Sequence, residues 1–234
     1  MNQITTIAFD ADDTLWVNEL LFTQTRIRLE KIVAPYIPIE SLEADLYKFE
    51  NQNLALFGYG IKGFMLSMIE TALEMTDYKL SGKDVQLIID LGKEMLQHPV
   101  EVLPGIVETL ENLKERYDLM IITKGDLFDQ ETKIARSGLA HYFQRVEIVS
   151  EKNPATYQEL IDHNGLDINR FLMIGNSLKS DVLPVCEIGG KAIHIPFHDT
   201  WVHERVESHE TEGKEYLELG DARDLIQLMK NPEP

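Results

Sequence analysis

Three carboxylates within four residues follow a short apolar run near the N-terminus. The run 4–9 predicts a buried strand, and Asp10, Asp12 and Asp13 come directly after it. Carboxylates this close repel one another unless a cation lies among them, and a hard divalent ion such as Mg²⁺ is the natural partner. Two acids two residues apart can also divide catalytic work, one as the nucleophile and one as the proton donor. The segment therefore predicts an enzyme.

Polar side chains also follow three later apolar runs that predict strands. These side chains are Thr123 and Lys124 after the run 119–122, Lys152 after the run 146–149, and Asn176 and Asp181 after the run 171–174. Ligands of open parallel sheets bind beyond the carboxyl ends of the strands, so these groups should gather at one edge. Carboxylates, a hydroxyl, ammonium groups and an amide together suit a metal ion and a phosphate group.

The elements that must position these groups divide the chain into two parts. Residues 18–98 show four helical apolar faces and almost no strand pattern, and Ser41 and Ser81 are suitable N-caps. From residue 100 onward, strands alternate with helices, which predicts a doubly wound parallel sheet. We expect an α/β fold with a Rossmann-like core in residues 1–16 and 100–234. An all-α domain is expected as an insert at residues 17–99.

The four strand-end segments resemble the four motifs of the haloacid dehalogenase-like (HAD) hydrolase superfamily, in the same order. Asp10-Ala11-Asp12-Asp13-Thr14-Leu15 is similar to the first motif, Ile122-Thr123 to the second, Lys152 to the third, and Gly175-Asn176-Ser177 through Asp181 to the fourth. The resemblance spans residues 4–190. It places the helical insert where this superfamily has its C1-type cap domain.

The resemblance implies a Mg²⁺-dependent phosphohydrolase that acts on a small phosphorylated metabolite. Asp10 would attack phosphorus and form an aspartyl-phosphate. Asp12 would protonate the leaving oxygen and then take a proton from the attacking water. True haloacid dehalogenases lack an acid at the position of Asp12, so phosphate chemistry is favoured over carbon–halogen cleavage.

The resemblance also assigns binding roles. Thr123 and the backbone N–H of Lys124 would hold the phosphoryl oxygens, and Lys152 would neutralise their charge and steady the nucleophile. The expected Mg²⁺ ligands are Asp10, the backbone carbonyl of Asp12, Asn176 and Asp181. These roles belong to the family pattern and apply here because the residues match it.

Two positions depart from the family pattern. Asn176 stands where the fourth motif usually has Asp; an amide oxygen can bind Mg²⁺ but brings no charge, so we expect weaker metal binding. Asp13 stands where Gly is common, and we expect an exposed side chain there. The first departure keeps two alternatives open. The chain could be a phosphomutase of the same superfamily, or a weakly catalytic protein that binds or senses phosphate.

A second motif points to a different class of protein. The sequence Gly58-Tyr59-Gly60-Ile61-Lys62-Gly63 matches the dinucleotide fingerprint, which requires a strand before it. The residues before it show a helical pattern, so a nicotinamide or flavin enzyme is disfavoured. We expect a loop between two helices, from which Lys62 reaches the substrate and contributes to substrate choice.

Composition limits the partners and the location. There are 40 acidic and 22 basic residues, a net charge of −18, which disfavours binding to nucleic acid or to an anionic membrane surface. No apolar run approaches the roughly 20 residues that span a bilayer, and no secretory signal is evident. Cys186 is the single cysteine, so no intrachain disulfide is possible. We expect a cytoplasmic protein; nothing in the sequence indicates its oligomeric state.

Overall fold

The structure is a computed structural model that describes residues 4–198, 204, 206, 211 and 213–230. Two compact units can be distinguished. The first consists of Met1–Glu19, Val100–Lys124 and Thr132–Pro234, and the second of Leu20–Pro99 and Gly125–Glu131. Residues 125–131 come after the strand predicted at residues 119–122, yet they belong to the second, helical unit.

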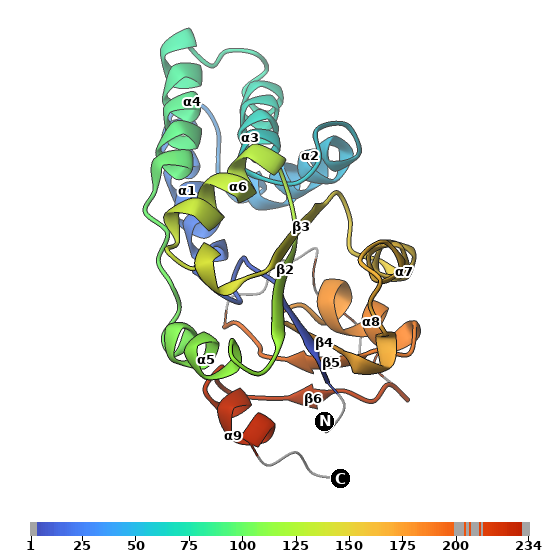
Figure 1. Cartoon of the computed structure of the whole chain (residues 1–234). Coiled ribbons are helices and arrows are strands. Elements are labelled where there is room, and N and C mark those ends of the chain that lie inside the picture. The colour runs from blue at the N-terminus through green and yellow to red at the C-terminus, as the bar shows by residue number, and fades with distance from the viewer. Residues whose placement is uncertain (1–3, 199–203, 205, 207–210, 212, 231–234) are drawn as a thin grey trace. The chain divides into compact units, whose positions relative to one another are not determined.

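The first unit is built on a parallel sheet, in which the described residues form six strands in the order β3-β2-β1-β4-β5-β6. The strands are β1 (Thr6–Phe9), β2 (Asp118–Lys124), β3 (Arg145–Val149), β4 (Phe171–Gly175), β5 (Lys191–His194) and β6 (Leu217–Glu218) (Figure 1). Phe9 pairs with Ile121 of β2 and Ile174 of β4, so β1 and β4 end close to one level and β2 continues three residues further, to Lys124. The predicted Rossmann-like α/β fold is confirmed.

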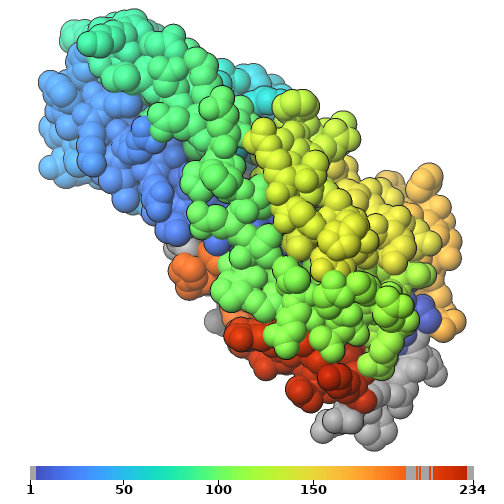
Figure 2. Space-filling model, turned by 60° about the vertical axis from the view of Figure 1, so that its left-hand side comes forward, coloured from blue at the N-terminus to red at the C-terminus, as the bar shows by residue number. Residues whose placement is uncertain are grey.

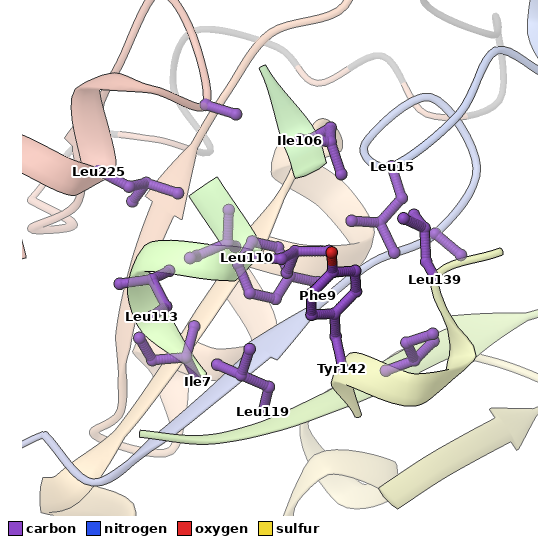
Figure 3. Close-up of a cluster of buried hydrophobic side chains, with 14 of the residues drawn as sticks. Ile7, Phe9, Leu15, Ile106, Leu110, Leu113, Leu119, Leu139, Tyr142 and Leu225 are labelled. Atoms are coloured by element: carbon purple, nitrogen blue, oxygen red, sulfur yellow. The ribbon is translucent and has the colours of Figure 1, made fainter. Parts of the chain in front are cut away.

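Helices cover both faces of this sheet. They are α5 (Ile106–Leu113), the part of α6 (Leu127–Arg136) from residue 132 onward, α7 (Pro154–His163), α8 (Leu183–Glu187) and α9 (Asp224–Lys230). Side chains alternate along a strand, so Ile7 and Phe9 of β1 pack with α5 and α9 on one face, while Ala8 packs with α7 and α8 on the other. Figure 3 shows Phe9 among residues of α5 and the loop that holds Tyr142. Figure 2 shows α5, in green, next to α9, in red.

Short turns complete the first unit. Ala140–Tyr142 and Ile168–Arg170 form 3₁₀ turns, and Leu178–Val182 forms a π-helical turn directly before α8. The sequence pattern indicates neither this π turn nor the two-residue strand β6. Single π turns occur often at functional sites, and this one carries Asp181.

The second unit contains most of the helical insert. Its helices are α1 (Glu19–Val33), α2 (Leu42–Phe57), α3 (Ile61–Met75) and α4 (Gly82–Gln97), with α1 starting at the boundary between the units. Each contributes side chains to one apolar core, for example Leu29, Leu46, Met68 and Ile88. Among the described residues no helix is both long and apolar enough to span a membrane.

The two expected N-caps of this unit differ. Ser81 caps α4, because its side chain accepts a hydrogen bond from the backbone N–H of Asp84 at 3.1 Å. Ser41 makes no such bond to α2, because its own backbone is already helical (φ −99°, ψ −5°), whereas a capping residue needs an extended conformation. The prediction is confirmed for Ser81 and wrong for Ser41.

The glycine motif of the second unit lies between two helices. α2 ends at Phe57 and α3 begins at Ile61, so a helix and not a strand precedes the motif. This excludes the context that the dinucleotide fingerprint requires. Gly58–Gly60 forms the expected loop, but Ile61–Gly63 already belongs to α3, which corrects the expected loop boundary.

Candidate active site

The acids and lysines predicted from the sequence gather at the carboxyl edge of the sheet. Asp10 follows β1, and its backbone N–H donates to the carbonyl of Ile174 in β4 at 2.9 Å. A pocket of about 100 Å³ lies here in the first unit. Its lining residues are Asp10, Asp12, Asp13, Asn18, Glu19, Lys152, Asn176, Ser177, Ser180, Asp181 and Glu204. The pocket is therefore lined almost entirely by polar groups.

Lys152 lies between two carboxylates at the buried end of the pocket. Its Nζ is 2.5 Å from Asp10 Oδ1 and 2.7 Å from Asp181 Oδ1. The pKa of Asp10 is raised to about 7. Burial is the largest cause, Lys152 opposes it and Asp181 adds to it. Burial by itself lowers the pKa of Lys152, but the two carboxylates raise it well above its usual value. Lys152 is therefore a permanent cation that can fix the position of the Asp10 carboxylate.

Asp12 has a separate set of partners. Lys133 Nζ lies 2.7 and 2.8 Å from its two carboxylate oxygens, and Trp16 Nε1 donates to Oδ1 at 2.8 Å. Lys133 also contacts Asn18 Oδ1 at 3.3 Å. Sequence reasoning missed both Lys133 and Trp16. Lys133 lies on α6 with no motif around it, and only a helical register that turned it toward the sheet could have indicated the pairing.

Asp13 is buried, which corrects the expectation of an exposed side chain. Its backbone has a positive φ of 61°, a left-handed conformation that explains why Gly suits this position. The carboxylate accepts hydrogen bonds from the backbone N–H groups of Asn18 (2.7 Å) and Glu19 (3.0 Å), where α1 begins. Burial raises the pKa of Asp13 to about 8, against the lowering effect of these bonds. Asp13 thus connects the loop after β1 to the start of α1.

Asn176 lies against the first motif. Its backbone N–H donates to Thr14 Oγ1 at 3.0 Å, and Thr14 Oγ1 lies 3.2 Å from Asp10 Oδ2. Gly175, just before it, has room for no side chain, since an added Cβ would lie 2.2 Å from Asp181 Oδ2. The close approach of Asp181 to the end of β4 therefore depends on the glycine.

Asp181 is held by two neighbours. Besides the contact with Lys152, its Oδ2 accepts from the backbone N–H of Ser177 at 3.0 Å. Burial raises the pKa of Asp181, and Lys152 lowers it. Both carboxylate oxygens thus have partners, one in the same turn and one just before α7, and Asp181 stabilises the position of Lys152.

The donor set suits a hard cation. Among the described residues no three His, Cys, Asp or Glu side chains are arranged to hold a metal. A mixed set does converge, because one terminal atom of the Asn176 amide lies 3.2 Å from both Asp10 Oδ2 and the Asp12 carbonyl oxygen. Carboxylate, carbonyl and amide oxygens are the ligands that Mg²⁺ prefers. The residues present therefore fit the expected ion with a single carboxylate.

Thr123 and Lys124 end β2 but do not line the pocket. Thr123 is buried. Lys124 Nζ contacts Ser180 Oγ at 2.9 Å and forms an ion pair with Glu204. Glu204 also accepts hydrogen bonds from the hydroxyls of Ser177 and Ser180. Burial opposes ionisation of Glu204, but Lys124 and the two hydroxyls lower its pKa. No sequence signal pointed to Glu204.

Lys62 and its neighbours belong to the second unit. Lys62 Nζ lies 2.9 Å from Asp126 Oδ1 and 5.5 Å from the centre of the Phe128 ring. Phe128 is 68% exposed. The side chain of Lys62 thus forms a half-exposed ion pair and a cation–π contact within its own unit.

Acids and a lysine beyond the carboxyl ends of parallel strands define an α/β enzyme whose site lies at the edge where such folds bind ligands. The chain belongs to the haloacid dehalogenase-like hydrolase family, whose model matches residues 4–184. That match includes every strand-end residue of the site. The resemblance recognised in the four motifs is therefore confirmed.

Several known proteins are similar to this chain. A glyceraldehyde 3-phosphate phosphatase from Methanothermobacter thermautotrophicus is 26% identical over 201 residues, which cover 81% of this chain and 84% of that protein. A pyrimidine 5'-nucleotidase, PynA, from Streptococcus pneumoniae is 30% identical over 155 residues, or 63% and 62% of the two chains. The crystal structure of a haloacid dehalogenase-like family hydrolase from Xanthomonas campestris is 40% identical, with a TM-score of 0.86 over 97% of this chain and 91% of that one.

Proposed function

We propose that this protein is a Mg²⁺-dependent phosphatase that hydrolyses a small phosphomonoester through an aspartyl-phosphate intermediate. The observation that carries this proposal is the position of Asp10, whose Oδ1 is fixed by Lys152 at 2.5 Å at the end of β1. Asp12 supports it as a second acid, two residues away, with its own partners. Two separately held carboxylates suit a nucleophile and an acid–base group.

In the first step an oxygen of Asp10 attacks phosphorus, and the bond between phosphorus and the leaving oxygen breaks. The leaving oxygen takes a proton from Asp12, so the product departs as a neutral alcohol. Lys152 neutralises part of the charge on the phosphoryl oxygens. Thr123 and the backbone N–H of Lys124 lie outside the residues that line the pocket, so their part in holding these oxygens rests on the motif alone. An aspartyl-phosphate on Asp10 remains.

In the second step water attacks the phosphorus of the aspartyl-phosphate. Asp12 takes a proton from that water, and the bond between phosphorus and the Asp10 oxygen breaks. Phosphate leaves, Asp10 returns as a carboxylate, and Asp12 is protonated for the next cycle. A single acid–base residue therefore serves both steps.

Asp10, the Asp12 carbonyl and Asn176 would hold Mg²⁺, with Asp181 adding negative charge nearby. When bound, the ion supplies positive charge that lets a phosphate dianion approach a carboxylate. Asp12 keeps its side chain available for proton transfer, because its backbone carbonyl rather than its carboxylate faces Asn176.

The substrate class follows from the relatives and the fold. Similar proteins are named as phosphatases of a triose phosphate and of pyrimidine nucleotides. We infer a small phosphorylated metabolite in the cytoplasm and assign the helical insert, residues 17–99, the role of a cap domain that selects the leaving group. Lys62 is the residue of that insert proposed to contribute to the choice.

The test is phosphate release from triose phosphates, sugar phosphates, phosphoglycolate and pyrimidine 5'-nucleotides, with Mg²⁺ or with a chelator. We expect Mg²⁺-dependent release by the wild type and at least about a 10³-fold loss in Asp10→Asn. Asp118→Asn, an exposed acid at the start of β2, is the matched control and should retain activity. Release that survives Asp10→Asn would contradict the nucleophile.

The remaining alternatives give different results in the same assay. A phosphomutase would transfer phosphate between substrate positions and require a bisphosphate to start. A protein that only binds or senses phosphate would bind phosphate and Mg²⁺ without turnover. Either result would overturn the phosphatase proposal.

A further inference from the structure

The terminal amide of Asn176 faces three oxygen atoms of the first motif. One of its two terminal atoms lies 3.2 Å from Asp10 Oδ2, 3.2 Å from the Asp12 carbonyl oxygen and 3.1 Å from Thr14 Oγ1. A carboxylate and a carbonyl only accept hydrogen bonds. The NH₂ group of Asn176 satisfies these acceptors when it is turned toward them.

In the opposite orientation, the amide oxygen rather than the NH₂ group faces these acceptors. Turned by 180°, the amide places its oxygen here, where it accepts a hydrogen bond from Thr14 Oγ1 at 3.1 Å but also faces Asp10 Oδ2 and the Asp12 carbonyl, so that three oxygens without a proton meet. Such a group is unfavourable without a cation and favourable around one. The nitrogen and oxygen of an amide have nearly the same size, so the turn needs little extra space.

We propose that Asn176 is a metal-responsive amide that stabilises this site both without Mg²⁺ and with it. Without the ion, its NH₂ group donates to Asp10 and to the Asp12 carbonyl. With the ion, the amide turns and its oxygen becomes a ligand. The proposal rests on the proposed function only for the place of the cation.

The two neighbouring acids explain why an amide matters at this position. Asp10 is already paired with Lys152, and Asp12 with Lys133, so each lysine has its carboxylate. An Asp at position 176 would add a negative charge beside Asp10, whereas the amide is neutral. Its carboxylate could donate no hydrogen bond to Asp10. It would also attract Mg²⁺ more strongly. Asn176 therefore stabilises the metal-free site and lowers its affinity for Mg²⁺. The rate of turnover should then rise with the concentration of free Mg²⁺.

The experiment compares wild type with Asn176→Asp and Asn176→Leu. Thermal unfolding is measured in a chelator and in saturating Mg²⁺, and Mg²⁺ binding is measured by calorimetry. In the chelator, both variants should unfold at a lower temperature than the wild type. Asn176→Asp should bind Mg²⁺ about tenfold more tightly and gain more from it in unfolding temperature, whereas Asn176→Leu should bind it more weakly.

A spectroscopic readout follows the amide itself. The side-chain NH₂ signal of Asn176, identified as the one missing from both variants in ¹⁵N NMR spectra, should shift when Mg²⁺ is added. A signal that does not move during the Mg²⁺ titration would show that the amide keeps one orientation, and the proposal would fail.

Asn18→Asp is the matched control, because Asn18 lines the same pocket and the substitution adds the same charge. An equal gain in Mg²⁺ affinity in Asn18→Asp would show a general charge effect and overturn the proposal. The proposal would also fail if the variants of Asn176, without metal, were as stable as the wild type. If no substrate releases phosphate but the Mg²⁺-linked differences appear, the phosphatase proposal fails and this one stands. If phosphate is released but the Mg²⁺-linked differences are absent, the phosphatase proposal stands and this one fails.

Discussion

Two lysines, Lys152 and Lys133, hold two acids of the same loop in different ways. Lys152 and Asp10 have side chains that are 2% and 10% exposed, and Lys152 also pairs with Asp181. Lys133 and Asp12 are 16% and 24% exposed. The buried group must keep its charges balanced to remain folded, whereas the outer pair can be changed with little effect on the fold. The proposed nucleophile, Asp10, is therefore linked to stability, and the proposed acid–base group, Asp12, is more nearly independent of it.

Lys152→Met should have the largest effect of the substitutions that test this difference between the two pairs. It leaves two buried carboxylates without their cation, which should lower the free energy of unfolding by about 3–5 kcal/mol and abolish phosphate release. Urea denaturation in a chelator measures the first effect. The double variant with Asp181→Asn removes one of the two carboxylates and should recover part of the stability. An unchanged urea midpoint in Lys152→Met would contradict this account.

Lys133→Met tests the outer pair. Asp12 would lose both of its contacts with Lys133 Nζ, so we expect kcat to fall by about 10–100-fold with a small change in KM. The free energy of unfolding should change by no more than about 1 kcal/mol. Lys133→Arg, which keeps the charge, should restore part of kcat. A large loss of stability with unchanged kcat would assign Lys133 a structural role instead.

The two acids should also differ in how protons affect Mg²⁺ binding. The pKa of Asp10 is raised to about 7 by burial, so its protonated form accumulates below that pH and competes with the metal. The apparent Mg²⁺ affinity should be constant above about pH 7 and fall by up to about tenfold per pH unit below it. Calorimetry from pH 5.5 to pH 8 measures this, and Asp12→Asn should retain the dependence. A flat profile would contradict the role of Asp10.

The smallest effect is expected from the exposed pair of Lys62, where the lysine and Asp126 are 48% and 29% exposed. Lys62→Ala should change the free energy of unfolding by less than about 1 kcal/mol. If Lys62 contributes to substrate choice, the ratio of kcat/KM between two phosphomonoesters should shift in this variant. Lys79→Ala, in another exposed pair of the same unit, is the control. An unchanged ratio would remove Lys62 from the proposed substrate contacts.

The sheet and the strand-end residues could be predicted because local sequence determines them. A strand buried on both faces is a continuous apolar run, as in β1, and the residues after such runs meet at one edge of a parallel sheet. The helical pattern before Gly58 is likewise confirmed, because α2 ends at Phe57, directly before this glycine.

The partners of these residues could not be predicted, because they depend on contacts between distant parts of the chain. Lys133 is 121 residues away from Asp12, and the sequence around it shows only an amphipathic helix. Glu204 lies in a segment with no recognisable pattern. Asp13 was misjudged because burial and a positive φ are properties of the folded loop, and the residue type alone indicates neither.

The contact between Trp16 and Asp12 also makes the protein its own optical probe. The indole of Trp16 is buried, and its N–H points at the carboxylate that is proposed to gain and lose a proton in each catalytic cycle. The chain has two tryptophans, so replacing Trp201 by Phe would leave Trp16 as the single indole emitter. Its fluorescence would then report changes in charge beside the scissile bond in real time, without an added label.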